Sequence, residues 1–447
     1  IMPSLVGSEM CIRDRQMRSM SAKQAFVFQH HELGNLVLNS AYTLVRSLSD
    51  KEIDKITFFK TDQKAIDIII QERSEGIKSE YIDLKRGLSS KKTNIVLIIV
   101  ESLSQQYVDA GYAPFISKLG EKGLYLNHNY ANGRRSIEAL PSILLGIPSL
   151  IKTPISQSKY QTNYFLGLPR ILIENGYNVS FYHGGKTGTM DFDSFTSSAG
   201  IRNYYGLEDY DGDDKHFDGT WGIYDHHFFD FMFRKINEEI VIQKKPFFNT
   251  FFTLSSHQPY SIPFEFKGRF PKGDLEIHES IGYADESIKI FFDKAKTQSW
   301  YKNTIFIITA DHTQKLEGNT SILDKYRVPL VLYHPEQLLV SNKTVTQHVD
   351  ILPSVLEFLE IEPKKKSYFG SSIFNNEAGR MINSNNGRVM FVKGSHFIST
   401  DFKSSSSYII KPNGLQKSED LNQDLLEEAK AYYQYGINGL IENNLYK

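Results

Sequence analysis

The fold is indicated first by the stretch IFIITADHT, residues 305–313. Its first six residues are apolar or β-branched, a run that favours a strand buried on both faces. Asp311 and His312 follow at once, where the chain is expected to turn into a loop. A carboxylate and an imidazole suit Mn²⁺, Zn²⁺ or Mg²⁺ as ligands. Taken alone, the pair is equally well explained by a capping aspartate beside a core histidine.

Comparable apolar runs alternate with helical patterns along the chain and predict an α/β fold with a central, mostly parallel sheet. Four of the five predicted strands end directly in polar or ionisable residues, and ligands of open α/β sheets bind beyond the carboxyl ends of the strands. A functional site is therefore predicted at this edge. The five runs are residues 94–100, 178–182, 247–254, 304–309 and 328–333, and the four endings are Glu101, His183, residues 255–257, and Asp311 with His312.

Glu101 stands where the apolar run NIVLIIV, residues 94–100, is predicted to end. Burying a carboxylate without a partner is costly, and a metal ion would compensate its charge. The alternative is a carboxylate placed at the N-terminus of a following helix, where the helix dipole stabilises it.

Ser136 begins an apolar helical run within NGRRSIEALPSILLGIPS, residues 132–149. Its hydroxyl is expected at a helix N-terminus, where the helix dipole favours an incoming anion. Arg134 and Arg135 add positive charge suited to a phosphate group. The alternative is plain N-capping by Ser136, with Glu138 nearby.

Three histidines border predicted strand ends or turns. His183 lies in FYHGG, His257 in LSSHQPY and His348 in QHVDILPS. A single histidine is more often structural than functional, but three in such places favour a site.

The composition excludes several classes of function. The 51 Lys and Arg balance 52 Asp and Glu, so a nucleic-acid partner receives no support. The one cysteine, Cys11, allows neither a disulfide framework nor a thiolate metal cluster. No apolar run reaches the roughly 18 residues that a membrane-spanning helix needs, and no signal peptide is evident.

Four segments are predicted from the change of pattern along the chain. Residues 1–15 differ from the rest, and we treat them as a non-native leader, so a native N-terminus and any upstream membrane anchor are expected to be missing. Residues 16–92 are expected to be a helical juxtamembrane or linker segment. Its apolar residues between 36 and 48 suit a helix that packs on the main domain or lies near a lipid surface.

Residues 93–379 are expected to form the catalytic domain, and residues 380–447 a small C-terminal α+β subdomain. The basis for the subdomain is a change to alternating segments followed by a helical pattern. The predicted strands are residues 388–392, 396–399 and 407–410, and the predicted helix covers residues 421–433.

Together and in this order, the motifs resemble the lipoteichoic acid synthase/phosphoglycerol transferase family, within the alkaline phosphatase and sulfatase superfamily. The resemblance spans roughly residues 35–370. It implies an alkaline phosphatase/sulfatase-like three-layer fold. In that family a glutamate after the first strand, a nucleophilic Thr or Ser and an Asp-His pair bind one divalent metal, usually Mn²⁺. The matching residues here are Glu101, Ser136, Asp311 and His312.

The resemblance also implies residues that contact substrate. His257 matches the histidine of a His-x-Pro-aromatic turn and is expected to be catalytic. His183 matches a histidine-glycine turn, and Trp221 and Asp225 match an aromatic-Gly-x-x-Asp segment. Arg135 is expected to help neutralise a phosphate, on the basis of its position alone.

The activity that this resemblance implies is phosphotransfer in the cell envelope. A phosphoglycerol-type group would move from a phosphatidylglycerol-like phospholipid to a glycan or glycerol acceptor through a phospho-Ser136 intermediate. His257, with His183, would move the protons. The catalytic domain would lie in the periplasm, held at the inner membrane surface by the missing N-terminal anchor.

Two departures from the family pattern leave the donor headgroup open. The well-studied Gram-positive members use Thr as the nucleophile, whereas this chain has Ser136. Those members also carry a Trp and an Arg after the histidine-glycine turn, where this chain reads HGGKTGTMDFD, with Met190 and Phe192 near those places. The chain is therefore similar to a divergent, Gram-negative branch.

Other functions stay open at this point. A sulfatase-like hydrolase of phosphate or sulfate esters is one, although the string Ser136-Ile-Glu-Ala-Leu lacks the Pro/Ala and Arg of sulfatases that mature a formylglycine. A phosphoethanolamine transferase usually has several disulfides, which one cysteine cannot supply. A two-zinc phosphomonoesterase would need more Asp and His ligands. Outside enzymes, the chain could be an inactive binding module of the envelope.

Overall fold

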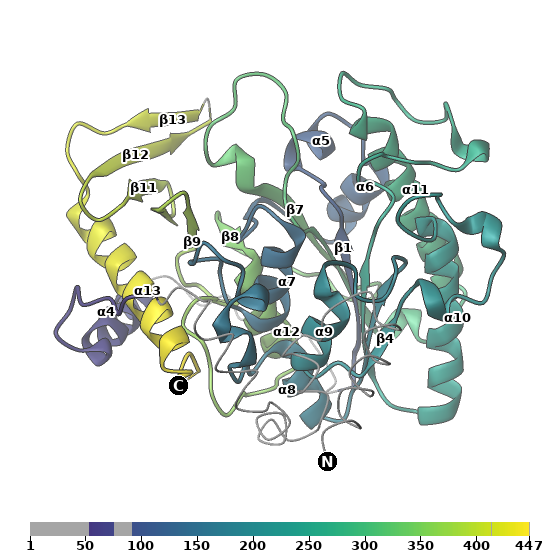
Figure 1. Ribbon diagram of the computed structural model, residues 1–447, viewed down its shortest axis with the longest axis horizontal. Helices are drawn as coiled ribbons and strands as arrows, with labels where there is room; N and C mark the ends of the chain where they lie inside the picture. Colours follow the sequence, from purple (N-terminus) through teal and green to yellow (C-terminus); the bar gives the residue numbers. More distant parts are fainter. Residues whose placement is uncertain (1–52, 76–91, 413, 447) are drawn as a thin grey trace, which may run out of the picture.

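A large mixed sheet forms the centre of the molecule in the computed structural model, which describes residues 53–75, 92–412 and 414–446. Its eight strands lie in the order β4-β3-β5-β1-β6-β7-β2-β8, and β4, β1, β7 and β8 are labelled in Figure 1. In chain order they are β1 Asn94–Val100, β2 Leu124–Tyr130, β3 Asn178–His183, β4 Asn203–Tyr205, β5 Phe247–Phe252, β6 Thr304–Ala310, β7 Arg327–Tyr333 and β8 Thr346–Gln347.

Strand β1 shows why the sheet is buried on both faces. All seven of its residues are buried, and its side chains alternate between two hydrophobic cores. Ile95, Leu97 and Ile99 belong to one core, whereas Val96 and Ile98 belong to the other. A strand that is apolar on both faces needs a layer of helices on each side, and the predicted three-layer α/β fold is confirmed.

Each face of the sheet has its own set of helices. The first core receives side chains from α4 Asp62–Glu75, α7 Ser136–Leu145, α8 Leu168–Glu174, α9 Phe192–Ser198, α12 Ile351–Phe358 and α13 Gln423–Ile441. The second core receives side chains from α5 Gln105–Asp109, α6 Pro114–Lys122, α10 Asp225–Gln243 and α11 Ile277–Ala295.

The strand directions decide which strand ends meet. Strands β3, β5, β1 and β6 are mutually parallel neighbours, so their carboxyl ends lie at one edge. Strand β7 runs antiparallel to both β6 and β2. The carboxyl end of β7, the predicted strand 328–333, therefore lies at the opposite edge. The short strands β2, β4 and β8 were not predicted.

A second, antiparallel sheet follows towards the C-terminus (Figure 1). Its strands lie in the order β13-β12-β11-β10-β9. Helix α13 packs on this sheet, and its side chains join the first core of the main sheet. The boundary at residue 380 therefore crosses a continuous core and stays a prediction. The strands are β9 Arg380–Asn385, β10 Arg388–Lys393, β11 His396–Thr400, β12 Ser405–Lys411 and β13 Gly414–Lys417.

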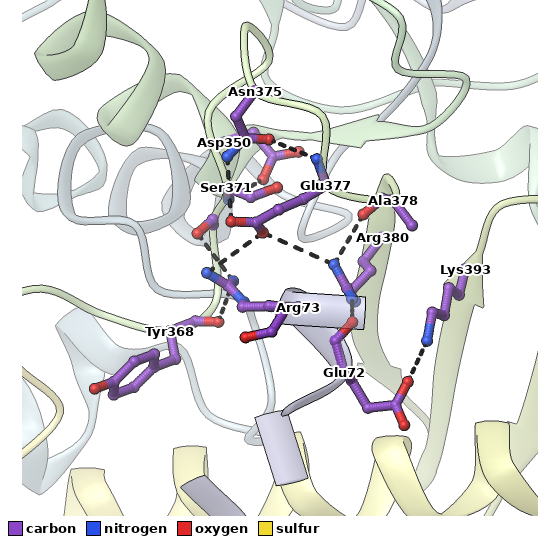
Figure 2. Close-up of polar contacts among 12 residues, drawn as sticks. Glu72, Arg73, Asp350, Tyr368, Ser371, Asn375, Glu377, Ala378, Arg380 and Lys393 are labelled. Atoms are coloured by element: carbon purple, nitrogen blue, oxygen red, sulfur yellow. Dashed lines mark hydrogen bonds and ion pairs between the residues drawn. The ribbon is translucent and has the colours of Figure 1, made fainter. Parts of the chain in front are cut away.

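Helix α4, which was not predicted, is fixed to the C-terminal sheet by a polar network (Figure 2). The Arg73 guanidinium donates to the carbonyl oxygens of Tyr368 at 2.5 Å and Gly370 at 3.0 Å. Next to it, Lys393 Nζ of β10 donates to Glu72 at 2.6 Å. Carbonyl groups shielded from water need hydrogen-bond partners. By supplying two of them, Arg73 links helix α4 to the turn 368–370.

The helix expected within residues 36–48 lies outside the described residues, as do the leader 1–15 and, within the predicted segment 16–92, residues 16–52 and 76–91. Among the residues that the structure describes, no helix combines the length and apolarity required to cross a bilayer.

Candidate metal centre and nucleophile

Sheet register places the predicted acidic residues side by side. Val100 at the end of β1 pairs with Ala310 at the end of β6. Glu101 and Asp311 are the next residues of two parallel neighbouring strands, so both carboxylates emerge at the same edge of the sheet. On the other side of β1, His183 at the end of β3 pairs with Phe252 at the end of β5. One sheet edge thus collects the endings of four strands.

Glu101, Asp311 and His312 form a compact group in which one ligand atom of each lies within 4.8 Å of the others. His312 Nε2 lies 3.2 Å from Asp311 Oδ2 and 3.8 Å from Glu101 Oε1. Asp311 is fully buried, and its Oδ2 atom has no hydrogen-bond partner among the described residues. Two carboxylates and an imidazole that converge in this way fit a divalent cation.

Ser136 joins this group from helix α7. Its hydroxyl lies 3.3 Å from Glu101 Oε2 and 3.5 Å from His312 Nε2. Ser136 is the first residue of α7, and Arg135 is the N-cap. The hydroxyl therefore points to the carboxylate group and does not act as the helix cap. All four residues predicted to bind metal are brought together.

Glu101, Asp311 and His312 are buried close together, and this shifts the pKa values of Glu101 and His312. Burial, helped by the charge of Asp311, raises the pKa of Glu101 to about 8. Burial alone would lower the pKa of His312, but the charges of Asp311 and Glu101 outweigh it, and the net shift is upward. Carboxylates so close repel each other. A divalent cation, which the resident groups Glu101, Asp311, His312 and Ser136 would hold, relieves that repulsion.

Several supporting residues were not predicted from the sequence. Ser102 N donates to Asp311 Oδ1 at 2.8 Å, and Ser102 Oγ donates to Glu101 Oε1 at 2.6 Å. Glu101 N donates to Thr253 Oγ1 at 2.9 Å, which ties β1 to the end of β5. Such bonds orient metal-ligating side chains. The signal in the sequence was slight: one serine directly after Glu101.

His348, singled out from the sequence, lies fully buried behind the group. Its Nδ1 accepts a bond from Asn132 N at 3.4 Å. Burial lowers the pKa of His348 to about 4. Because Asn132 opens the segment that leads to Ser136, His348 holds the loop that carries the hydroxyl.

His257 and Trp221 form a second part of the site. Their rings pack edge to face with centroids 4.4 Å apart. Trp221 Nε1 donates to the carbonyl oxygen of Gln258 at 2.7 Å, which fixes the indole on the turn that carries His257. His257 is only partly buried and is accessible to a substrate.

His183 lies deeper than expected for a residue that contacts substrate. It is fully buried, and its Nε2 atom has no hydrogen-bond partner among the described residues. Burial lowers its pKa to about 4, with a smaller contribution from the charge of His257. His183 is therefore neutral near pH 7, and the group that faces solvent is His257.

A close approach between two backbones joins these histidines. Gly222 forms an antiparallel bridge with Gly185, and a Cβ atom on Gly222 would lie 2.0 Å from the carbonyl oxygen of Gly184. Only glycine fits there. The bridge holds the loop of Trp221 against the turn that follows His183.

Asp225 lies inside the protein and supports the site from behind. Its Oδ1 accepts from Leu254 N at 2.8 Å, and its Oδ2 accepts from Ser255 N at 3.2 Å. It is 1% exposed, and burial raises its pKa to about 7. Its partners are backbone groups of the segment that leads to His257, and a contact of Asp225 with substrate stays a prediction.

The two arginines before Ser136 point to different partners. Arg135 Nε donates to Glu138 Oε1 at 3.0 Å, and its side chain is about half exposed. The expected phosphate contact would require Arg135 to leave that pair. Arg134 lies over the ring of Tyr326 at 5.5 Å, and its charge lowers the pKa of His312. Arg134 thus acts on the metal group electrostatically.

Comparison with known proteins identifies the family of the chain. The family model named Sulfatase matches residues 93–361. The chain is 24% identical over 377 residues to a lipoteichoic acid synthase of Staphylococcus saprophyticus, a match that covers 77% of this chain and 55% of that protein. It is 25% identical over 251 residues to phosphoglycerol transferase I of Escherichia coli, covering 52% of this chain and 32% of that protein.

Solved structures share the fold. A protein of the alkaline phosphatase superfamily from Vibrio parahaemolyticus superposes with a TM-score of 0.73 at 21% identity, over 87% of this chain and 98% of that one. The lipoteichoic acid synthase LtaP of Listeria monocytogenes superposes with a TM-score of 0.70 at 19% identity, over 85% and 98%.

The chain spans about half the length of the lipoteichoic acid synthases it matches. The family model covers more than half of the chain, and the resemblance predicted from the motifs is confirmed by the relatives. The chain therefore belongs to the sulfatase family, and within it the chain is similar to lipoteichoic acid synthases and to phosphoglycerol transferase I.

Proposed function

We propose that the chain is the catalytic part of a metal-dependent phosphotransferase that acts through a phospho-Ser136 intermediate. It moves a phosphoglycerol-type group from a phospholipid such as phosphatidylglycerol to a glycan or glycerol acceptor of the cell envelope. One observation carries the proposal: the Ser136 hydroxyl, at the start of α7, lies 3.3 Å from Glu101 and 3.5 Å from His312. A nucleophile beside candidate metal ligands is the arrangement that phosphoryl transfer requires.

A divalent cation, Mn²⁺ by family resemblance, would be held by Glu101, Ser136, Asp311 and His312. When bound, it would lower the pKa of the serine hydroxyl and stabilise negative charge on the phosphoryl oxygens. The amide groups at the start of α7 add positive potential at the same place.

In the first half-reaction, a bond forms between Ser136 Oγ and the donor phosphorus. The bond from phosphorus to the diacylglycerol oxygen breaks. The bound cation would keep the Glu101 carboxylate ionised, and the hydroxyl proton of Ser136 passes along its hydrogen bond to that carboxylate. His257 gives a proton to the departing diacylglycerol oxygen. Diacylglycerol leaves, and phosphoglycerol remains esterified to Ser136.

In the second half-reaction, the acceptor hydroxyl gives its proton to His257 and its oxygen bonds to phosphorus. The bond from phosphorus to Ser136 Oγ breaks, and the serine regains its proton from Glu101. Both residues return to their starting states. His183, buried and neutral, holds the turn that faces His257 and transfers no proton in this scheme.

The name of one group of curated relatives, phosphoglycerol transferase I, supports a phosphoglycerol-type group as the one transferred. The name lipoteichoic acid synthase supports an envelope polymer as the product. We place the catalytic domain outside the cytoplasm, at the inner membrane surface, where phospholipid donors and envelope acceptors meet.

The donor is tested with vesicles that contain either phosphatidylglycerol or phosphatidylethanolamine, with Mn²⁺ and the purified chain. The proposal expects release of diacylglycerol from the first vesicle alone, and none from a Ser136→Ala variant or after addition of EDTA. Equal release from phosphatidylethanolamine would favour a phosphoethanolamine transferase. Release of free glycerol phosphate without transfer to an added glycerol or glucan acceptor would favour a hydrolase.

A further inference from the structure

A second cluster of metal-binding side chains lies apart from the Glu101 group. His226 and His227 are the second and third residues of α10, and Glu265 lies in the 3₁₀ turn Phe264–Phe266. One ligand atom from each of the three lies within 4.8 Å of the others. Two imidazoles and a carboxylate are the donor set of many zinc sites.

The imidazoles of His216, His226 and His227 lie against one another, and burial together with this proximity favours the neutral form of His226 and His227. The ring of His216 lies on that of His227 with centroids 3.4 Å apart, and the rings of His226 and His227 are 3.8 Å apart. Burial, then the neighbouring histidines, lower the pKa of His226 to about 3 and that of His227 to about 4. Neutral imidazole has the free lone pair that a metal ligand needs.

Tyrosine hydroxyls fix two of these rings. Tyr283 Oη lies 2.5 Å from His226 Nδ1, and Tyr210 Oη lies 2.6 Å from His216 Nδ1. A metal-ligating histidine commonly gives its other ring N–H to a hydrogen-bond acceptor, and a tyrosine hydroxyl oxygen can accept such a bond. With Nδ1 engaged by Tyr283, the atom of His226 left for a cation is Nε2.

The other two proposed ligands, His227 and Glu265, are not engaged in competing interactions within the described residues. Within the described part of the chain, neither the His227 ring nitrogens nor the Glu265 carboxylate has a hydrogen-bond or ion-pair partner. Lys294, whose positive charge opposes protonation of His226 and His227, is held by Asp230. The start of α10 also carries positive potential, which the Glu265 carboxylate offsets.

We propose that His226, His227 and Glu265 form a second divalent-cation site that prefers Zn²⁺ and is distinct from the Glu101 group. Imidazole suits zinc better than Mg²⁺ or Ca²⁺, and three protein ligands leave a fourth tetrahedral position for water or a further imidazole. His216, stacked on His227, is the nearest further imidazole.

The position of this site suits it to fix the segment around His257, which is expected to contact substrate. Its histidines directly follow Asp225, which binds the backbone of Leu254 and Ser255, and Glu265 lies in the loop after His257. A cation bound there connects the start of α10 to the loop beyond the catalytic turn. The site would therefore brace the segment that carries His257.

The test counts Zn²⁺ bound per chain, by elemental analysis of tag-free, full-length protein after dialysis against buffered micromolar Zn²⁺. The wild type is expected to hold two equivalents, one in each site. The double variant His226→Gln/His227→Gln and the variant Asp311→Asn are each expected to hold one, and their combination none. His396→Gln, which changes an exposed histidine of β11, serves as the matched control and should hold two.

Because the double variant could disturb α10, the exposed Glu265 gives a gentler test. Glu265→Gln should weaken Zn²⁺ binding in the Asp311→Asn background at least tenfold, with the circular dichroism spectrum unchanged. The proposal is overturned if the double variant holds as much Zn²⁺ as the wild type. It is equally overturned if the wild type holds one equivalent that Asp311→Asn removes, a result that leaves the proposed phosphotransferase intact.

Discussion

The Ser136 hydroxyl lies 3.3 Å from the Glu101 carboxylate, although 35 residues separate them in the chain. Glu101 comes from the central strand β1, and Ser136 starts helix α7 on one face of the sheet. The proposed phosphotransfer depends on this contact, since it joins a candidate nucleophile to a candidate metal group.

Asp311→Asn is expected to abolish metal binding at the Glu101 group without unfolding the protein. Asparagine keeps an oxygen that can accept from Ser102 N and His312 N, as Asp311 Oδ1 does, but it replaces the unpartnered Oδ2 with an amide. Mn²⁺ affinity should fall by about 100-fold or more. Calorimetric titration with Mn²⁺ measures this change, and equal melting temperatures of variant and wild type in EDTA provide the control. Unchanged affinity would exclude Asp311 as a ligand.

Gly222→Ala is expected to displace the loop that carries Trp221. The added methyl group would meet the Gly184 carbonyl at 2.0 Å, and overpacking of this kind costs about 1–3 kcal/mol. The chain has two tryptophans, so a Trp300→Phe background makes fluorescence report on Trp221 alone. A red shift with weaker activity is expected. An unshifted spectrum would show that the bridge to Gly185 does not position the indole.

His183 is expected to make the protein less stable in acid. Its pKa falls from 6.5 to about 4 on folding, so below pH 6.5 the unfolded chain takes up a proton that the folded chain does not. Stability is therefore lost as the pH falls from 6.5 to 4, by about 1.4 kcal/mol per unit. Urea unfolding at several pH values tests this. The stability advantage of the wild type over His183→Gln should shrink across that range, and a constant difference would contradict it.

Arg73→Leu is expected to lower the free energy of unfolding by about 2–4 kcal/mol, because it leaves the carbonyl groups of Tyr368 and Gly370 without their charged donor. Arg73→Lys should recover only part of that loss, since one ammonium cannot reproduce the fork of the guanidinium. Chemical denaturation measures both. A neutral effect of Arg73→Leu would mean that α4 contributes little to stability.

The central strands could be predicted from the sequence because their residues are apolar on both faces. Strand β1 was predicted with its observed bounds, and β3, β6 and β7 within one residue at each end. Strand β2 has two exposed residues and alternates irregularly, so it gave no comparable signal. Helix α4 has a weakly amphipathic pattern and is explained by tertiary contacts with α13, which no local pattern contains.

Site residues that directly follow a strand could be predicted from the sequence. Contacts between segments far apart in the chain could not. Glu101, Asp311 and His312 directly follow strands. Asp225 lies in a matching motif, yet its partners are the backbone groups of Leu254 and Ser255, which a motif cannot reveal. The cluster of His226, His227 and Glu265 joins a helix to a loop about 40 residues further along the chain, and it went unnoticed because sequence spacing gives no sign of that contact.

The most direct test of the account is the mass of the intact protein after incubation with phosphatidylglycerol and Mn²⁺. We predict an added mass equal to one glycerophosphoryl group, located on Ser136 by fragmentation. It should be absent in Ser136→Ala and retained in Ser136→Thr, whose hydroxyl can replace that of serine. An adduct of the same size in Ser136→Ala, or its appearance on another residue of the wild type, would contradict the role of Ser136 as the nucleophile.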